Sequence, residues 1–427
     1  MTSTGIHTLA IEHVPIGDLR PDPANPRRIS DAELEALTRS IQQFGMVDPV
    51  IARREDKTVI GGHQRLVAAR RLGLKTVPVI FLDVTAEQAR LLNLALNKIS
   101  GSWDQELLAR LLAELKDVPD VDLSLSGFEE DEIKKLLKGL EVRDKRERPE
   151  SFDLDAGLEA AKAEPLAWPG DLWLLGDHRL VCGDSTDGEA VRRLLDAHKA
   201  AVAFTDPPYN VDLGHHGGQS REGRRRTIAN DALPPEQWEA FVRAWGGNLL
   251  ENVNGAIYIC MSTREWPTVS RILAELGAHW SDTIIWAKDR FVLGRADYQR
   301  MYEPVWYGWR EGAEHHWCGD RDQGDVWIIQ RPAHSELHPT MKPLELVERA
   351  IENSSRPGDI VLDLFLGSGT TLVAAERTGR ICYSVELEPR YCRVAVARWE
   401  AFTGDKAVTE RSDRRMTVDF VPKQSDG

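Results

Sequence analysis

The first third of the chain alternates between helical apolar patterns and short apolar runs. Ser30 and Glu33 form a capping-box sequence that opens a helix, and Gly45 is placed to end it. Apolar runs at residues 49–53, 58–62 and 77–81 predict strands, and residues 63–73, 86–96 and 104–115 have the period of helices. The pattern predicts a small α/β unit.

The second half has a stronger alternation of strands and helices. A hairpin turning at Gly176 and Asp177 opens it. Apolar runs at residues 201–206, 256–261, 282–288 and 360–365 predict strands, and residues 235–250, 343–354 and 371–379 predict helices. This order predicts a doubly wound α/β fold, Rossmann-like, whose mixed and mostly parallel sheet has helices on both faces.

The two halves are separated by a charged, proline-containing stretch. Residues 141–167 are expected to form a linker or an irregular helix, and the polar residues 403–427 a frayed tail. We therefore expect a domain at 8–140, whose later part is a helical extension, and a second domain at 168–402. No apolar stretch is long enough for a membrane span and no signal pattern opens the chain, so a cytoplasmic protein without membrane contact is expected.

The composition of the chain adds three constraints on the class of protein. The chain of 427 residues is 42% hydrophobic and 29% charged, which is typical of globular proteins. Its five cysteines form no CxxC pair, which fits a reducing compartment. The net charge of −14 would repel nucleic acid, so any DNA contact must use local basic patches.

A glycine-containing turn follows the predicted strand at 360–365. Gly367 and Gly369 let the backbone approach a ligand, and the next helix presents unpaired N–H groups. Glu386 ends the following predicted strand, where a carboxylate can accept hydrogen bonds from ribose hydroxyls. A nucleotide-like ligand and a plain strand-to-helix turn both explain this pattern.

The tetrapeptide at the end of the strand 201–206 indicates the chemistry. Pro207 and Pro208 remove two N–H donors, so carbonyl oxygens and the Asp206 carboxylate are left at the strand end. Asp206 and the Pro207 carbonyl can accept the two N–H bonds of an exocyclic amine, and Tyr209 offers a ring for stacking an extruded base. The alternative is an ordinary surface turn.

Residues 168–400 resemble the β class of DNA amino-methyltransferases that use S-adenosylmethionine, in which the base-amine motif precedes the glycine motif. The matching segments are GDLWLLGDHRLVCGDS, TDPPYN, IIWAKD, HPTMKP, DLFLGSGTT and SVELEP. The resemblance implies a target-amine site at Asp206, Pro207, Pro208 and Tyr209. It implies a cofactor site at Asp184, Phe365, Gly367, Ser368, Gly369, Thr370, Glu386, His338, Thr340, Lys342 and Pro343. Cytosine C5 methylation requires a Pro-Cys nucleophile, and the chain has none.

The target amine is adenine N6 or cytosine N4. An aspartate at the first motif position leans to adenine in this family, whereas the site chemistry leaves both amines open. Target recognition is expected at about 290–332, and DNA phosphates are expected at basic side chains on two segments. These side chains are Arg221, Arg224, Arg225, Arg226, Lys288, Arg290, Arg295 and Arg300.

Residues 8–100 resemble the ParB-like N-terminal domain. The resemblance rests on DLRPDPANPR, FGMVDPVIA and VIGGHQRLVAARRLGLKTVPVIFLD, and a strand-to-helix turn within the last segment could bind phosphate. That turn consists of Gly61, Gly62, His63, Gln64 and Arg65. A nucleotide or nucleic acid is one expected partner, and a turn that merely packs is the alternative. The sequence shows no helix-turn-helix after it.

The sequence thus predicts a DNA methyltransferase that modifies an exocyclic amine of double-stranded DNA, most readily adenine N6. Two rivals are a ParB-like DNA-binding or partition adaptor with a non-catalytic methyltransferase scaffold and a fusion with a nuclease. No metal is expected, because the spacing of His315, His316 and Cys318 is irregular. The oligomeric state, the recognition sequence and a cognate restriction enzyme are left open.

Overall fold

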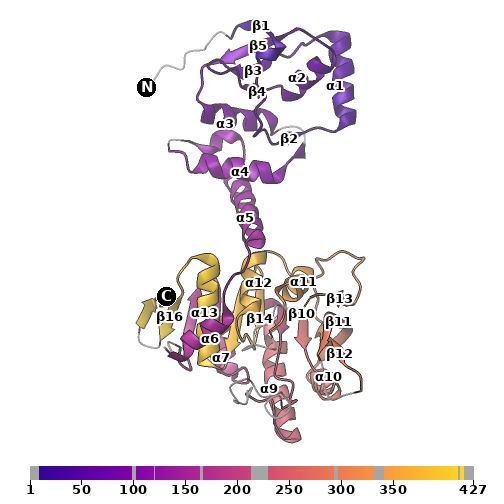
Figure 1. Ribbon diagram of the computed structural model, residues 1–427, viewed down its shortest axis with the longest axis vertical. Helices are drawn as coiled ribbons and strands as arrows, with labels where there is room; N and C mark the ends of the chain where they lie inside the picture. The colour runs from indigo at the N-terminus through magenta and orange to yellow at the C-terminus, as the bar shows by residue number, and fades with distance from the viewer. Residues whose placement is uncertain are drawn as a thin grey trace. The chain divides into compact units, whose positions relative to one another are not determined.

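The computed structural model describes residues 9–98, 102–119, 121–163, 167–212, 229–292, 297–330, 341–411 and 414–417. The chain divides into two compact units, residues 1–144 and 145–427, which are described separately. Figure 1 shows the elements of each. Within the described residues, no helix is long and apolar enough to span a bilayer.

The first unit is built on a four-stranded sheet in the order β1-β5-β3-β4. Ser30 and Glu33 form the expected capping box at the start of α1, and Gly45 ends this helix with φ +76°. Apolar side chains of the sheet and α2 share one core, which includes Val50, Val79 and Leu66. The elements are β1 (Ile11–Pro15), η1 (Ile16–Asp18), β2 (Arg27–Arg28), α1 (Asp31–Phe44), β3 (Val50–Arg53), β4 (Val59–Gly61), α2 (His63–Arg71) and β5 (Thr76–Leu82).

Helices follow this sheet in the same unit. Leu94 of α3, Leu112 of α4 and Ile133 of α5 belong to one apolar cluster. The elements are α3 (Ala86–Asn97), β6 (Ser102–Trp103), α4 (Gln105–Lys116), η2 (Leu123–Ser126) and α5 (Glu130–Glu147), whose last residues lie in the second unit.

The second unit is a doubly wound α/β domain. Its sheet has 11 described strands in the order β13-β11-β12-β10-β9-β14-β15-β8-β7-β16-β17. The five central strands, β10 to β8 in this order, run parallel, and most of the outer pairs are antiparallel. The mixed, mostly parallel sheet predicted from the sequence is confirmed.

Helices cover both faces of this sheet (Figure 1). Apolar residues of α7, α9 and α10 share one core with the sheet, whereas those of α11 and of α12 with α13 form two others. The helices are α6 (Leu154–Ala163), α7 (Gly188–Leu195), α9 (Pro235–Asn252), α10 (Trp266–Glu275), α11 (Leu344–Ser354), α12 (Thr370–Thr378) and α13 (Pro389–Thr403). The strands are β7 (Leu172–Leu175), β8 (His178–Cys182), β9 (Ala200–Thr205), β10 (Val253–Cys260), β11 (Ala278–Val292), β12 (Arg300–Arg310), β13 (Val326–Ile328), β14 (Ile360–Asp363), β15 (Ile381–Glu386), β16 (Val408–Arg411) and β17 (Arg414–Thr417).

The connections reverse direction between β9 and β14. After β9 the chain passes through α9 to β10, and after β14 it passes through α12 to β15 on the other side of the sheet. Diverging loops at such a switch point leave a crevice beyond the carboxyl ends of the strands. The fold therefore places a ligand site after β9 and β14.

Regular structure occurs in the segment expected to be a linker or an irregular helix and in the segment expected to be a frayed tail. Residues 141–147 continue α5, and α6 packs Leu158 and Ala161 against Val394 of α13. In the expected tail, β16 pairs antiparallel with β7. Charged residues are so frequent in both segments that the few apolar residues that pack there give no clear periodic pattern in the sequence.

Candidate active site

The tetrapeptide of Asp206 to Tyr209 lies directly after the buried strand β9. The Tyr209 hydroxyl donates to Asp206 Oδ1 at 2.7 Å. Asn210 has φ +53° and fixes the next turn, because its side-chain oxygen accepts from Leu233 N at 2.7 Å and its amide donates to Leu233 O at 3.2 Å. The aspartate and tyrosine therefore have a defined mutual orientation at the switch point.

The glycine turn lies after the neighbouring strand β14. Gly367 has φ +57°, and its N–H donates to Glu386 Oε2 at 2.7 Å. The other carboxylate oxygen of Glu386 accepts from Glu388 N at 2.8 Å. Burial raises the pKa of Glu386 to about 7, although these two backbone donors oppose the shift. An acceptor that can change charge near neutral pH is thus fixed beside the turn.

One cavity of about 250 Å³ joins the two motifs. Asp184, which follows β8, lies on its wall and is oriented by the Thr186 hydroxyl and N–H, each 2.8 Å from Asp184 Oδ1. The predicted residues on the wall are Asp184, Asp206, Pro207, Pro208, Tyr209, Lys342, Phe365, Gly367, Ser368, Thr370 and Glu386. The structure therefore brings together the expected amine site and most of the expected cofactor site.

Gly369 has a different place from the one expected. It does not line the cavity but caps α12 with φ +93°. A Cβ at this position would lie 3.0 Å from Ala395 Cβ and 3.2 Å from Ala395 Cα on α13. Gly369 therefore allows two helices to pack closely. Pro343 also lies outside the wall, where it caps the start of α11.

Four charged side chains form what we call the charged cluster: Asp206, Glu303, Lys288 and Lys342. Lys342 Nζ lies 2.6 Å from Asp206 Oδ2 and 3.4 Å from Glu303 Oε2, and Lys288 Nζ lies 2.5 Å from Glu303 Oε1. The side chains of Lys342 and Lys288 are 7% and 8% exposed, whereas that of Asp206 is 25% exposed. Two carboxylates thus match two ammonium groups, and Asp206 retains exposed surface.

The pKa directions follow from this arrangement. Burial raises the pKa of Asp206, and the Lys342 ammonium opposes the shift. Burial also acts on Glu303, but Lys342 and Lys288 outweigh it and lower the pKa of Glu303 to about 2. Burial and the two carboxylates raise the pKa of Tyr209, so its hydroxyl stays a donor. Burial raises the pKa of Cys260, which is therefore no ready thiolate nucleophile.

Two important acids were absent from the predicted site. Glu303 is one, and Asp363 at the end of β14 is the other. Asp363 Oδ1 accepts from the Thr205 hydroxyl at 2.9 Å and from Phe365 N at 3.0 Å, so it joins the ends of β9 and β14. Burial raises the pKa of Asp363 to about 6. An acidic residue next to apolar neighbours was the available signal for each.

The residues that are expected to contact DNA lie in different surroundings, and some lie outside the described part of the chain. Lys288 is buried against Glu303 rather than placed for a phosphate, because β11 directs it toward the charged cluster. Arg290 is 78% exposed and pairs with Asp289 at 3.0 Å, and Arg300 donates to the Thr263 hydroxyl at 3.2 Å. Arg221, Arg224, Arg225, Arg226, Arg295, His338 and Thr340 lie outside the described residues.

The ParB-like turn of the first unit is covered by its own side chains. Gly61 ends β4, and Gly62 caps α2 with φ +89°. Arg65 forms an ion pair with Asp48, and its guanidinium lies against Gly62. Burial lowers the pKa of His63 to about 4, so this imidazole is neutral near pH 7. Within the part of the chain that the structure describes, no cluster of three potential metal ligands occurs.

Comparisons with known families agree with this division of the chain. The family described as DNA methylase matches residues 200–397, and the ParB N-terminal domain matches residues 2–98. A third family, the ParB-methyltransferase HTH domain, matches residues 106–169. The expectation that no helix-turn-helix follows the ParB-like segment is therefore wrong. Charged residues are frequent in α5, so the sequence pattern does not reveal the apolar residues that pack with those of α4 in one cluster.

Curated relatives match the second unit. Type II methyltransferase M2.DpnII of Streptococcus pneumoniae is 32% identical over 221 residues, which cover 47% of this chain and 82% of the relative. DNA adenine methyltransferase YhdJ of Escherichia coli (strain K12) is 28% identical over 246 residues, or 49% of this chain and 80% of the relative. The chain therefore belongs to the DNA methylase family, and the protein is a DNA methyltransferase that also carries a ParB N-terminal domain.

Solved structures resemble each unit more distantly. The M1.HpyAVI–SAM complex is 24% identical with a TM-score of 0.39, and the match covers 51% of this chain and 98% of that one. The chromosome-partitioning protein ParB from Caulobacter crescentus complexed with CTP-gamma-S is 22% identical with a TM-score of 0.21. That match covers 32% of this chain and 82% of the other.

Proposed function

We propose that this DNA methyltransferase transfers a methyl group from S-adenosylmethionine to the N6 amine of an adenine extruded from double-stranded DNA. The observation that carries the proposal is the shared cavity, which Asp206 and Tyr209 line together with Gly367 and Glu386. Adenine is favoured by the aspartate that opens the tetrapeptide and by the adenine methyltransferase among the relatives.

The residues on the cavity wall fit the cofactor. Glu386 has lone pairs beyond the two that accept Gly367 and Glu388, and these can accept ribose hydroxyls. Phe365 offers an apolar surface, and Asp184 is oriented just after the carboxyl end of β8. The bound cofactor would supply an electrophilic methyl group on a sulfonium.

Asp206 and Pro207 would hold the target amine. The carboxylate oxygens of Asp206 accept from Tyr209 and Lys342, and each oxygen has a second lone pair for an amine N–H. Lys342 favours the ionised form of Asp206, so the carboxylate remains an acceptor despite burial. It can then stabilise positive charge on the attacking nitrogen and accept the proton that this nitrogen loses.

The Glu303 carboxylate would keep this arrangement neutral. Without it, Lys342 and Lys288 would place two positive charges beside a nitrogen that itself becomes positive. Glu303 also lies 3.4 Å from the Tyr209 hydroxyl, where it helps to keep the ring at the cavity. The charged cluster thus keeps Asp206 in place as an acceptor, and it adds no net positive charge that would oppose the reaction.

Nucleoside analysis tests the proposal. The full chain is incubated with S-adenosylmethionine and mixed-sequence DNA, and the digested nucleosides are measured by mass spectrometry. N6-methyladenine is expected. N4-methylcytosine would overturn adenine as the target but retain the amine chemistry, and the absence of both would contradict the proposal.

DNA contacts outside the cavity form a second part of the proposal. We infer that Arg221, Arg224, Arg225 and Arg226 neutralise DNA phosphates. Replacing all four by alanine should reduce the slope of log affinity against log salt by up to about 3.6, since each phosphate contact contributes about 0.9. An unchanged slope would contradict this role. For the ParB-like and helix-turn-helix region we propose binding of DNA or a nucleotide, which filter binding with each labelled ligand tests.

A further inference from the structure

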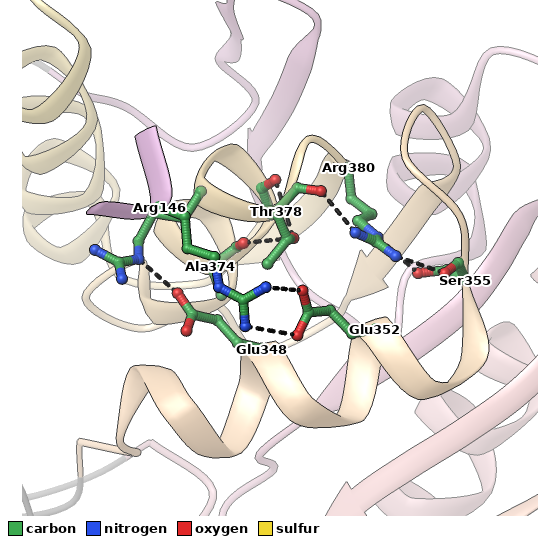
Figure 2. Close-up of polar contacts among 9 residues, drawn as sticks. Arg146, Glu348, Glu352, Ser355, Ala374, Thr378 and Arg380 are labelled. Carbon is green, nitrogen blue, oxygen red and sulfur yellow. Dashed lines mark hydrogen bonds and ion pairs between the residues drawn. The ribbon is translucent and has the colours of Figure 1, made fainter. Parts of the chain in front are cut away.

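The segment of residues 145–150, here called the connector, is bound to the second unit by ion pairs. Lys145 Nζ lies 2.7 Å from Glu376 Oε1 on α12. Arg146 makes two contacts with Glu352 of α11, at 2.8 and 3.2 Å. Figure 2 shows Arg146 beside the acidic side chains of α11. The connector is therefore attached along the helices that follow and precede β14.

Glu150 makes the deepest of these contacts. It binds Arg398 of α13 through both carboxylate oxygens, one of them 2.8 Å from Arg398 Nη2. The Arg398 side chain is 2% exposed, whereas that of Glu150 is 16% exposed. A buried guanidinium needs an anionic partner, because its desolvation is costly. Glu150 supplies that charge from the connector.

Arg398 also contacts the glycine turn. Its Nη1 donates to the Ser368 carbonyl at 3.1 Å and to the Thr370 hydroxyl at 3.3 Å. Ser368 and Thr370 both line the cavity of the active site. One planar guanidinium thus binds the connector on one edge and the wall of the cofactor site on the other.

A cavity lies beside the contact between Glu150 and Arg398. This second cavity, of about 610 Å³, is lined by Arg148, Glu150, Phe152 and Arg398 among others. Glu150 can therefore leave Arg398 without forcing apart a tightly packed core. The helix-turn-helix family match covers residues 106–169, which include the connector.

We propose that Glu150 is a positioning residue for cofactor binding, which acts through Arg398 on the turn at Ser368 and Thr370. The inference rests on the proposed use of S-adenosylmethionine at that turn. Glu150 fixes the guanidinium, and the fixed guanidinium holds the turn in the conformation that lines the cavity. Loss of the carboxylate leaves Arg398 free to rotate away from the Ser368 carbonyl, so cofactor affinity falls while the amine site at Asp206 is retained.

The test compares Glu150→Gln with Glu352→Gln in the full chain. Glu352→Gln breaks another ion pair of the same connector but has no contact with the glycine turn. Calorimetric titration with S-adenosylmethionine should show about tenfold weaker binding for Glu150→Gln and at most about twofold for Glu352→Gln. In kinetics, the KM for the cofactor should rise while kcat at saturation stays within about twofold.

Equal affinity of Glu150→Gln and the wild type would overturn the inference, and so would equal weakening by both substitutions, which would indicate general loss of docking. If Glu150→Gln does not fold, Glu150→Asp replaces it. That variant keeps the charge but shortens the reach to Arg398, so weaker cofactor binding supports the inference and unchanged binding overturns it. Failure of the wild type itself to bind the cofactor would instead contradict the proposed function.

Discussion

Two strand-to-helix turns of this protein share one backbone geometry and differ in their surroundings. Gly62 and Gly369 both cap a helix at positive φ, +89° and +93°. The turn before Gly369 opens on a cavity and a buried carboxylate, whereas Arg65 and Asp48 cover the turn at Gly62. A left-handed glycine before a helix therefore identifies a turn, and the side chains around the turn decide whether it opens on a cavity.

The largest difference between the turns should appear in catalysis. Asp206→Ala removes the carboxylate that shares a cavity with the glycine turn of the second unit, so methyl transfer should fall by about 10³-fold or more, as for loss of a preorganised transition-state contact. Arg65→Ala at the other turn should leave the rate within about twofold. Initial rates with tritiated cofactor measure both. Substantial activity in Asp206→Ala would contradict the proposed role of this residue.

The free energy of unfolding should fall more when Gly369 is replaced by alanine than when Gly62 is. Gly369→Ala combines a left-handed conformation with a methyl group pressed against Ala395 of α13, and about 3 kcal/mol of destabilisation is expected. Gly62→Ala meets the flexible end of Arg65, 3.1 Å away, so about 1 kcal/mol is expected. Chemical denaturation of each variant provides the comparison. Equal losses would show that the close approach of α12 and α13 matters little.

Cofactor affinity should depend on pH through Glu386. Burial raises its pKa to about 7, so the folded protein favours the neutral carboxyl below this pH and the acceptor carboxylate above it. If the carboxylate accepts ribose hydroxyls, affinity should increase about tenfold from pH 6 to pH 8, because the ionised fraction does. Glu386→Gln should bind more weakly and without this dependence. A wild-type affinity that is flat over the same range would contradict the role of the carboxylate.

Much of the second unit could be predicted because local sequence patterns specify it. Buried parallel strands such as β9 and β14 are short apolar runs, and the motifs lie directly after them. What could not be predicted depends on register. Glu303 reaches the site only because β12 pairs with β11, and Lys342 meets Asp206 across 136 positions of the chain. The motifs next to Lys342 and Lys288 predict a cofactor role and a DNA role, and they carry no information about these contacts.

The smallest effect is expected at the ParB-like turn. Asp48→Asn removes the ion pair of Arg65 beside the start of α2, where backbone N–H groups favour anions. Binding of a labelled nucleoside triphosphate should become about two- to fivefold tighter, within the range of one charge near a helix terminus. Asp48→Glu, which keeps the charge, is the control. Unchanged binding would show that the ion pair does not close this turn.

The most direct test of the shared cavity is a crystal structure with a cofactor analogue whose methyl sulfonium is replaced by an amine. The amino-acid part is expected to bind at Phe365, Gly367 and Ser368. The ribose is expected to contact Glu386, and the substituted amine to face Asp206. An analogue bound elsewhere, or one whose amine points away from Asp206, would show that the two motifs do not form one active site.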